Sequence, residues 1–509
     1  MKYGFYITFL IALCLFVGCR KEQHEQIREF SAEDFKAWKV SEYMLNSARI
    51  RSEIHRLSAQ KGIRMYADAF TRNYYNRHGA FLWIDRMGAG SRADTLLSWL
   101  AQTPALGLKK SSFHVDEITA DLEKLRRLRF SPDESINTVA ARVEFNLTQA
   151  YLRYVCGQRF GYVNPYTCFN RLERTDTTRN APYRRLFDIP TETATDSFVH
   201  VALQQIRQER FTNFLTGIQP THPVYRRLLQ AYQSGSDTLI QSQKLLVNLE
   251  RSRWRTPQPS GKYVWVNIAG FTLTAVNEEQ EEILRMRVCG GDLRHKTPLL
   301  YSLIDRVEFN PYWIIPTSII KREIAPRHAG SSTYFERNRI RILNKATGEE
   351  MDPTELSAAQ LKSGKYTLRQ DRGEGNSLGR MIFRFPNNFS VFLHDTNNRS
   401  AFTRKIRAIS HGCVRVERPL DLAIFLMNEP QPDVIDRMRI AIDLPPLTAQ
   451  GRQEQQDPDR KKISVYPFSP TIPVFIHYYT VYPSPNGALE TFPDSYGYDE
   501  VLQQKLNAF

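Results

Sequence analysis

The residues best suited to covalent chemistry lie in one short stretch, SVFLHDTNNRSAFTRKIRAISHGCVRVE, which covers residues 390–417. His394 ends an apolar run, and Cys413 stands downstream between a glycine and a valine. A nucleophilic cysteine needs a base that takes its proton, and N–H donors for the oxyanion that forms when a carbonyl is attacked. We therefore predict an acyl-transfer site in which Cys413 is the nucleophile and His394 the base, with Gly412 leaving room for a substrate beside the sulfur.

The remaining cysteines do not form a metal-binding pattern. The sequence has six cysteines and no CxxC pair, and a metal held by His411 and Cys413 would need further ligands at suitable spacing, which we do not find. We therefore expect neither a metal nor a cofactor. Cys156 and Cys168 are close in sequence, so a disulfide between them remains an open question. Cys289 is interpreted as a small buried hydrophobic residue.

The first residues, MKYGFYITFLIALCLFVGCRKE, have the layout of a secretory signal, with a lysine near the start and an apolar stretch that ends at Gly18 and Cys19. The end of this segment, LFVGC, resembles a bacterial lipobox, although Phe16 replaces the usual aliphatic residue. We predict a lipoprotein signal at 1–19 with lipidation of Cys19, and a plain short anchor is the alternative. The protein would then be exported and lipid-anchored in the cell envelope, facing the periplasm of a Gram-negative-type bacterium.

Composition and charge exclude some classes of protein. The chain has 509 residues, of which 41% are hydrophobic and 24% charged, so it is globular and long enough for two or more structural units. The formal net charge of +15 favours anionic partners such as membrane headgroups or wall polymers. The basic residues are scattered in short runs and no nucleic-acid motif is present, so nucleic acid is not an expected partner.

The elements that must position the site change character along the chain. Residues 25–253 have helical periodicity, as in the single apolar stripe of 139–154, and we predict a helical scaffold domain there. Short runs of strand-forming residues then indicate a β-rich catalytic domain at 260–445. A helical or irregular cap is inserted at about 317–363, and the strands of the catalytic domain resume at KYTLRQ. Two further segments are expected: a polar linker at 446–463, and a C-terminal strand and tail at 464–509 that pack on the catalytic domain. The fold class is therefore α+β.

The run from Ser410 to Arg415, together with the upstream His394, resembles the active-site signature of the L,D-transpeptidases, whose catalytic domain is called YkuD-type. Further segments are similar to the large, scaffold-bearing YcbB-like members of this family: FHVDEI, NLERSRW, YVWVNIAGFTL, KTPLLYSLIDRVEFNPYWIIPTSI, NSLGRMIFRFPN and IPVFIHYYT. One departure is that no room remains before NLERSRW for the small peptidoglycan-binding module that these relatives usually carry. The lipid on Cys19 would then take over the positioning role.

The resemblance implies a substrate and a reaction. Cys413 would attack the L,D peptide bond between the third and fourth residues of a donor tetrapeptide stem of peptidoglycan, expelling D-alanine and leaving a thioester. The amine of the third-position diamino acid on an acceptor stem would then take the acyl group and form a 3-3 cross-link. The cap would keep water away from the thioester. Acylation of Cys413 by carbapenems is also expected.

Supporting roles follow from the same resemblance. His394 would relay protons in both half-reactions, and the main chain at Asp395 would hold the other imidazole nitrogen. Backbone N–H groups of Gly412 and Cys413, and of His411 as a third, would form the oxyanion hole.

Three further side chains in this stretch have expected roles, two of them with alternatives. Ser410 is expected to be a supporting residue of the site. Arg415 would orient the site or attract stem carboxylates, and the alternative is a structural ion pair. His411 is the alternative to His394 as base, because it lies close to the cysteine in sequence.

Two other functions remain open on the sequence alone. If water replaces the acceptor amine, the same residues make an L,D-carboxypeptidase or a cross-link hydrolase. The alternative of another class is a catalytically idle lipoprotein that binds the wall.

Overall fold

The computed structural model describes residues 43–85, 88–175, 181–208, 210–235, 241–460 and 462–509. The predicted signal segment and Cys19 lie outside these residues. Within them, no helix combines the length and the apolar character that crossing a membrane requires. The chain divides into two compact units: one contains the described chain up to Gln158, Ala194–Gln219 and Phe509, and the other contains Arg159–Thr193 and Pro220–Ala508.

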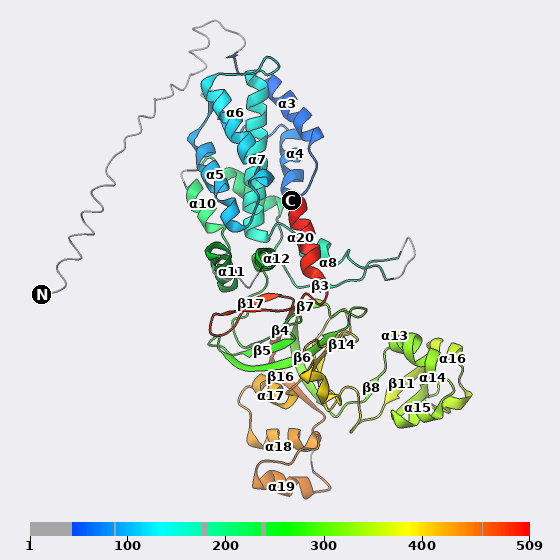
Figure 1. Cartoon of the computed structure of the whole chain (residues 1–509). Coiled ribbons are helices and arrows are strands. Elements are labelled where there is room, and N and C mark those ends of the chain that lie inside the picture. Colours follow the sequence, from blue (N-terminus) through cyan, green and yellow to red (C-terminus); the bar gives the residue numbers. More distant parts are fainter. Residues whose placement is uncertain (1–42, 86–87, 176–180, 209, 236–240, 461) are drawn as a thin grey trace, which may run out of the picture. The chain divides into compact units, whose positions relative to one another are not determined.

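The first unit is helical and is built around one long helix (Figure 1). Helix α7 (Ile136–Phe160) is buried on nearly all of its faces, whereas its periodicity predicted a single buried stripe. The difference arises because this helix also buries polar side chains, among them Glu144, which accepts N–H bonds from Trp83 and Ile84 at 3.0 and 3.1 Å. The surrounding helices are α3 (Ser47–Gln60), α4 (Tyr66–Asn76), α5 (Ser91–Ala101), α6 (Val115–Arg127), α9 (Asp196–Gln205) and α10 (Phe211–Gly217).

The second unit contains a ten-stranded sheet in the order β12-β13-β15-β6-β5-β4-β16-β7-β3. Strand β12 also pairs with β7, so the sheet closes on itself, and β14 is added beside β6. These strands are β3 (Phe187–Asp188), β4 (Tyr263–Asn267), β5 (Thr272–Val276), β6 (Glu282–Gly291), β7 (Leu299–Phe309), β12 (Met381–Arg384), β13 (Leu393–His394), β14 (Ala408–Ser410), β15 (Val414–Val416) and β16 (Val465–His477). The combination of a helical first unit and a β-rich second unit confirms the predicted α+β class.

The C-terminal segment completes this sheet. Strand β16 runs parallel to β4 and antiparallel to β7, and its residues Val474 and Ile476 are fully buried. The segment at 446–463, predicted as a linker, contains helix α19 (Ala449–Gln456). Two helices precede it, α17 (Pro419–Leu426) and α18 (Pro432–Ala441), and helix α20 (Tyr498–Ala508) ends the second unit.

The cap insertion has a sheet and a core of its own. Its four-stranded sheet has the order β10-β9-β11-β8, formed by β8 (Trp313–Ile314), β9 (Ile340–Asn344), β10 (Glu350–Met351) and β11 (Tyr366–Gln370). The KYTLRQ strand, β11, thus belongs to the cap and not to the catalytic sheet, because its Leu368 is fully buried in the cap core. The helical pieces are α13 (Thr317–Ile319), the π-helix η4 (Ile320–Ile324), α14 (Ala325–His328), α15 (Ser332–Arg337) and α16 (Ala358–Lys362) (Figure 1).

The cysteines of the described chain are free thiols. Cys156 lies on α7 and Cys168 on α8 (Pro165–Phe169), and both are buried. The disulfide left open by the sequence is therefore not present in this structure. Burial raises the pKa of these thiols, to about 12 for Cys156 and about 11 for Cys168, so neither is a reactive thiolate at neutral pH.

Candidate active site

The parallel pairing of β13 with β15 brings the predicted histidine and cysteine onto neighbouring strands. Leu393 pairs with Val414 and His394 with Arg415, and the Val414 N–H donates to the carbonyl of Phe392 at 3.1 Å. Leu393 and Val414 are fully buried and anchor this pairing. Because side chains alternate along a strand, His394 and Arg415 project from the same face of the strand pair, opposite to the two anchors.

The turn before β15 is fixed by hydroxyl groups. The Ser410 hydroxyl donates to the Cys413 carbonyl and accepts the Gly412 N–H at 3.1 Å. The buried Thr297 hydroxyl donates to the Gly412 carbonyl at 2.9 Å and accepts the Gly291 N–H at 2.8 Å. Gly412 has φ +113°, a conformation that other residues rarely adopt, while the nearest atom to an added Cβ would be 3.7 Å away. The backbone conformation, and not a lack of space, therefore selects glycine here.

Tyr496 of the C-terminal segment supports this turn through hydrogen bonds to Gly291 and Thr297. The Tyr496 hydroxyl donates to the Gly291 carbonyl at 2.7 Å and accepts the Thr297 N–H at 3.1 Å. At Gly291 a Cβ would lie 1.9 Å from the carbonyl oxygen of His295, so only glycine fits. Sequence reasoning did not single out Thr297 or Tyr496, because neither lies near the motif and single hydroxyl residues carry no distinguishing pattern.

Cys413 is partly exposed, and its Sγ lies 3.8 Å from the carbonyl oxygen of Ser390. Desolvation raises the pKa of this thiol to about 11, while the backbone N–H of Phe392 and the guanidinium groups of Arg384 and Arg415 act in the opposite direction. The resting site therefore holds a neutral thiol at pH 7, surrounded by positive charge that favours the thiolate once a base removes the proton.

His394 is suited to accept that proton. Its side chain is only 4% exposed, and its Nδ1 atom has no hydrogen-bond partner within the described chain. Desolvation and the charge of Arg415 lower the pKa of His394 to about 3, against weaker opposing contributions from backbone groups of Asp395 and Leu378. The imidazole is therefore neutral at physiological pH, which is the form that a general base requires.

The Asp395 side chain has a structural role. Its carboxylate accepts the Arg380 N–H and an N–H of the Arg399 guanidinium, both at 2.9 Å. A Cβ at Gly379 would lie 2.5 Å from this carboxylate, so the glycine allows the close approach. The carboxylate is committed to these partners, and it is the backbone of Asp395 that contributes to the pKa of His394.

Arg415 has no carboxylate partner among the residues that the structure describes. It is half-buried, and its Nε atom makes no hydrogen bond there. Nearby Arg384, in contrast, is held by both carboxylate oxygens of Glu308, at 3.1 and 3.0 Å. The structural ion pair proposed as an alternative for Arg415 is thus not found in the described chain, and its guanidinium is available to an anionic ligand.

The predicted oxyanion donors are not equivalent. The Gly412 N–H is already donated to the Ser410 hydroxyl. The N–H groups of His411 and Cys413 form no hydrogen bond with the rest of the described chain. These two groups are therefore the better candidates for binding an oxyanion, and Gly412 contributes through its conformation.

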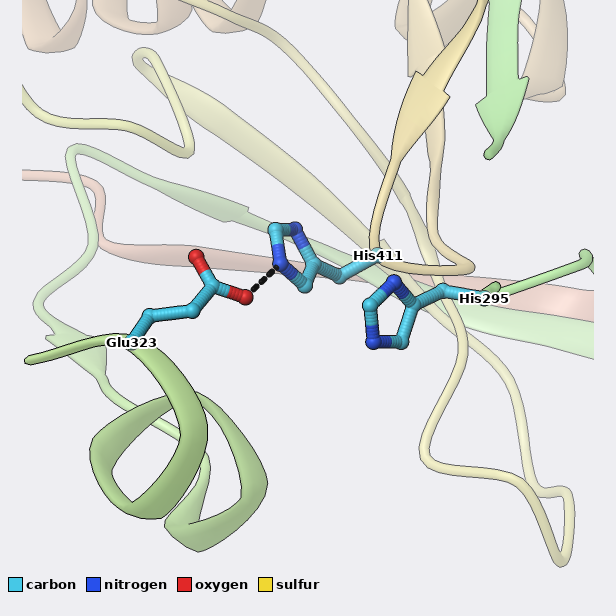
Figure 2. Close-up of side chains that lie close together, drawn as sticks. All are labelled: His295, Glu323 and His411. Atoms are coloured by element: carbon cyan, nitrogen blue, oxygen red, sulfur yellow. Dashed lines mark hydrogen bonds and ion pairs between the residues drawn. The ribbon is translucent and has the colours of Figure 1, made fainter. Parts of the chain in front are cut away.

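The His411 imidazole is engaged elsewhere. Its Nε2 lies 2.5 Å from Oε1 of Glu323 on η4 of the cap, and its ring lies 4.6 Å from that of His295, centroid to centroid (Figure 2). This arrangement favours His394 over His411 as the base. Glu323 and His295 were missed in the sequence, since they are distant from His411 along the chain and only tertiary contacts bring them together.

Comparison with known proteins agrees with this geometry. Residues 261–435 match the family of L,D-transpeptidase catalytic domains, called YkuD, and residues 68–231 match the scaffold domain family. A curated protein of Haemophilus influenzae, whose own L,D-transpeptidase assignment is provisional, is 29% identical over 304 residues, which cover 59% of this chain and 58% of that protein. The match thus spans less than two thirds of that relative.

Residues 261–435, which contain the Cys413 turn, accordingly match the catalytic domain of the L,D-transpeptidases, a family of acyltransferases. The match to a scaffold domain beside this catalytic domain is consistent with the scaffold-bearing, YcbB-like members of the family.

Proposed function

We propose that this protein forms 3-3 cross-links in peptidoglycan, with Cys413 as nucleophile and His394 as general base. The observation that carries the proposal is the β13–β15 pairing, which places a buried neutral imidazole on the strand next to the thiol. In the first half-reaction, His394 takes the thiol proton as Sγ attacks the carbonyl of the third stem residue. The N–H groups of Cys413 and His411 would bind the oxyanion.

Collapse of the tetrahedral intermediate would break the L,D peptide bond. The protonated His394 then gives its proton to the departing D-alanine amine, and a thioester remains on Cys413. In the second half-reaction, the amine of the acceptor stem attacks the thioester carbonyl, and His394 takes its proton. Expulsion of the sulfur, which recovers that proton, forms the new amide and restores the free thiol.

Arg415 is proposed to recognise the donor stem. The stem ends in a carboxylate, and the guanidinium of Arg415 lacks an ion-pair partner in the described residues while lying next to His394 in the sheet register. A charged hydrogen bond of this kind contributes roughly 1.5–3 kcal/mol. Recognition of the carboxylate would also discriminate against amidated stems.

We further propose that the protein is exported and held in the membrane by a lipid on Cys19, facing the periplasm. The support for this is the lipobox-like LFVGC at the end of the apolar N-terminal segment. Lipidation would keep the catalytic domain near the wall. Metabolic labelling with an alkyne fatty acid should tag the wild-type protein and not the Cys19→Ala variant.

The experiment that tests the activity uses disaccharide tetrapeptides analysed by mass spectrometry. The protein should release D-alanine and produce the 3-3 dimer, and Cys413→Ala should produce neither, whereas Cys289→Ala, which alters a buried thiol, should keep both activities. Release of D-alanine with only tripeptide as product would instead assign a carboxypeptidase. An intact-mass adduct with a carbapenem at Cys413 is expected in parallel.

A further inference from the structure

Three side chains from separate segments converge beside the turn that carries Cys413. His295 follows β6, Glu323 lies on η4 of the cap, and His411 precedes Gly412 (Figure 2). One donor atom from each of the three lies within 4.8 Å of the others. The exposed fractions of the three side chains are 17%, 36% and 38%, respectively, so the cluster is accessible to small solutes.

The hydrogen bond between His411 and Glu323 accounts for only part of this arrangement. The His295 ring packs on the His411 ring, with an angle of 33° between their planes, and shares no hydrogen bond with it. Two imidazoles at this separation next to a carboxylate supply two nitrogen donors and one oxygen donor. This is a donor set that Zn²⁺ and similar borderline metal ions bind, with one position left for water.

A second carboxylate fixes one of the ligands. Asp292 Oδ1 lies 3.0 Å from Nδ1 of His295, and it also accepts the N–H groups of Arg294 and His295, each at 2.8 Å. An acceptor on Nδ1 fixes the tautomer that has its proton there and leaves the Nε2 lone pair for a metal. Carboxylate support of this kind is what metal-ligating histidines commonly have.

We propose that His295, Glu323 and His411 bind a divalent transition-metal ion of the Zn²⁺ type, which ties the cap to the turn carrying Cys413. With tetrahedral bonds of roughly 2.0–2.2 Å, the ligand atoms of a zinc site are about 3.3–3.6 Å apart. The donor atoms here lie within 4.8 Å of one another, and metal binding would replace the hydrogen bond of 2.5 Å between His411 and Glu323 and move these two atoms apart. The site would be a structural clamp, because it joins an insertion with its own core to the turn of Cys413 without using the thiol. It goes beyond the proposed function and does not depend on it.

Isothermal titration with ZnCl₂ tests the site in the full, untagged Cys413→Ala protein, in which the accessible thiol cannot bind the metal. One Zn²⁺ per chain is expected. Glu323→Gln and His295→Gln should each weaken binding by at least tenfold, whereas Glu336→Gln, which changes an exposed cap carboxylate outside the cluster, should leave it unchanged. Mg²⁺ should not bind, because it prefers all-oxygen sites.

A structural measurement locates the ion. Hydrogen exchange of the η4 segment, residues 320–324, should slow when ZnCl₂ is added to the Cys413→Ala protein and should not respond in Glu323→Gln. Absence of zinc binding to Cys413→Ala would overturn the proposal, as would binding that both cluster variants leave intact. Since these experiments measure no turnover, they are independent of whether Cys413 forms a thioester.

Discussion

His394 lies directly opposite Arg415 in the parallel pairing of β13 and β15. A positive charge next to a buried imidazole opposes its protonation, and this adds to the effect of desolvation on the pKa of His394. The same guanidinium favours the thiolate of Cys413. The pairing therefore favours the neutral form of His394, the proposed base, and lowers the free-energy cost of deprotonating Cys413, the proposed nucleophile.

The first prediction concerns the protonation state of the nucleophile. Because the pKa of Cys413 is raised to about 11 by desolvation, the thiolate fraction should rise about tenfold per pH unit from pH 7 to 10. The rate of iodoacetamide alkylation of Cys413, measured by intact mass in the Cys289→Ala background, should rise in proportion. A rate that is already constant below pH 8 would indicate a resting thiolate–imidazolium pair and contradict the prediction.

The second prediction separates the two histidines. His394→Gln removes the proposed base and should lower kcat/KM by about 10²–10⁴-fold. His411→Gln changes a side chain directed at Glu323 of the cap and should have a much smaller effect. Steady-state release of D-alanine measures both variants, and a larger loss for His411→Gln would reverse the assignment of the base.

The third prediction concerns Arg415. Arg415→Gln should lower kcat/KM for tetrapeptide stems by about tenfold or more, since a charged hydrogen bond is worth roughly 1.5–3 kcal/mol. The loss should be largely absent with a stem whose terminal carboxylate is amidated. Arg404→Gln, which alters an exposed arginine of the same segment, is the matched control. Equal losses with both substrates would show that Arg415 acts only on the structure of the site.

The fourth prediction tests the support of the catalytic turn. Thr297→Val keeps the shape of the side chain but leaves the Gly291 N–H and the Gly412 carbonyl without their buried partner. The free energy of unfolding should fall by about 1–3 kcal/mol, and turnover should fall with it. Thr297→Ser, which restores the hydroxyl, should recover most of both. Unchanged urea unfolding of Thr297→Val would contradict this role.

The fifth prediction concerns acid sensitivity. Desolvation lowers the pKa of buried His477 to about 3, below the usual value of about 6.5. The unfolded chain therefore binds more protons than the folded one below about pH 6.5, and stability should be lost as the pH falls from there toward 3.

For this one histidine the loss at pH 5 is about 2 kcal/mol. His477→Phe would keep an aromatic ring stacked on Trp265, whose ring centroid lies 4.0 Å from that of His477. The free energy of unfolding of this variant, measured in urea, should differ less between pH 7 and pH 5 than that of the wild type. The same pH dependence in the variant and the wild type would count against this assignment.

Local patterns in the sequence were enough for much of the fold, and they led to the proposal that Cys413 and His394 are the reacting pair. Hydrophobic periodicity distinguished the helical first unit from the β-rich second unit, and the glycine next to Cys413 marked a turn that the structure confirms through φ +113°. The strand β11 was assigned to the wrong sheet, because a short apolar run predicts a strand and not its partner. The hydrogen bond from the Gly412 N–H to Ser410 could not be predicted from the sequence either, since it depends on the geometry of the turn.

By itself, then, the sequence determined the class of fold and the residues proposed to do the chemistry, because residue type and spacing act over short distances along the chain. Tertiary structure alone decided which groups surround them. Thr297, Tyr496, His295 and Glu323 reach the Cys413 turn from segments far away in sequence, and no periodicity encodes such contacts. The physical reason is that side-chain chemistry is local, whereas desolvation, charge and hydrogen bonding depend on the neighbours that folding brings near.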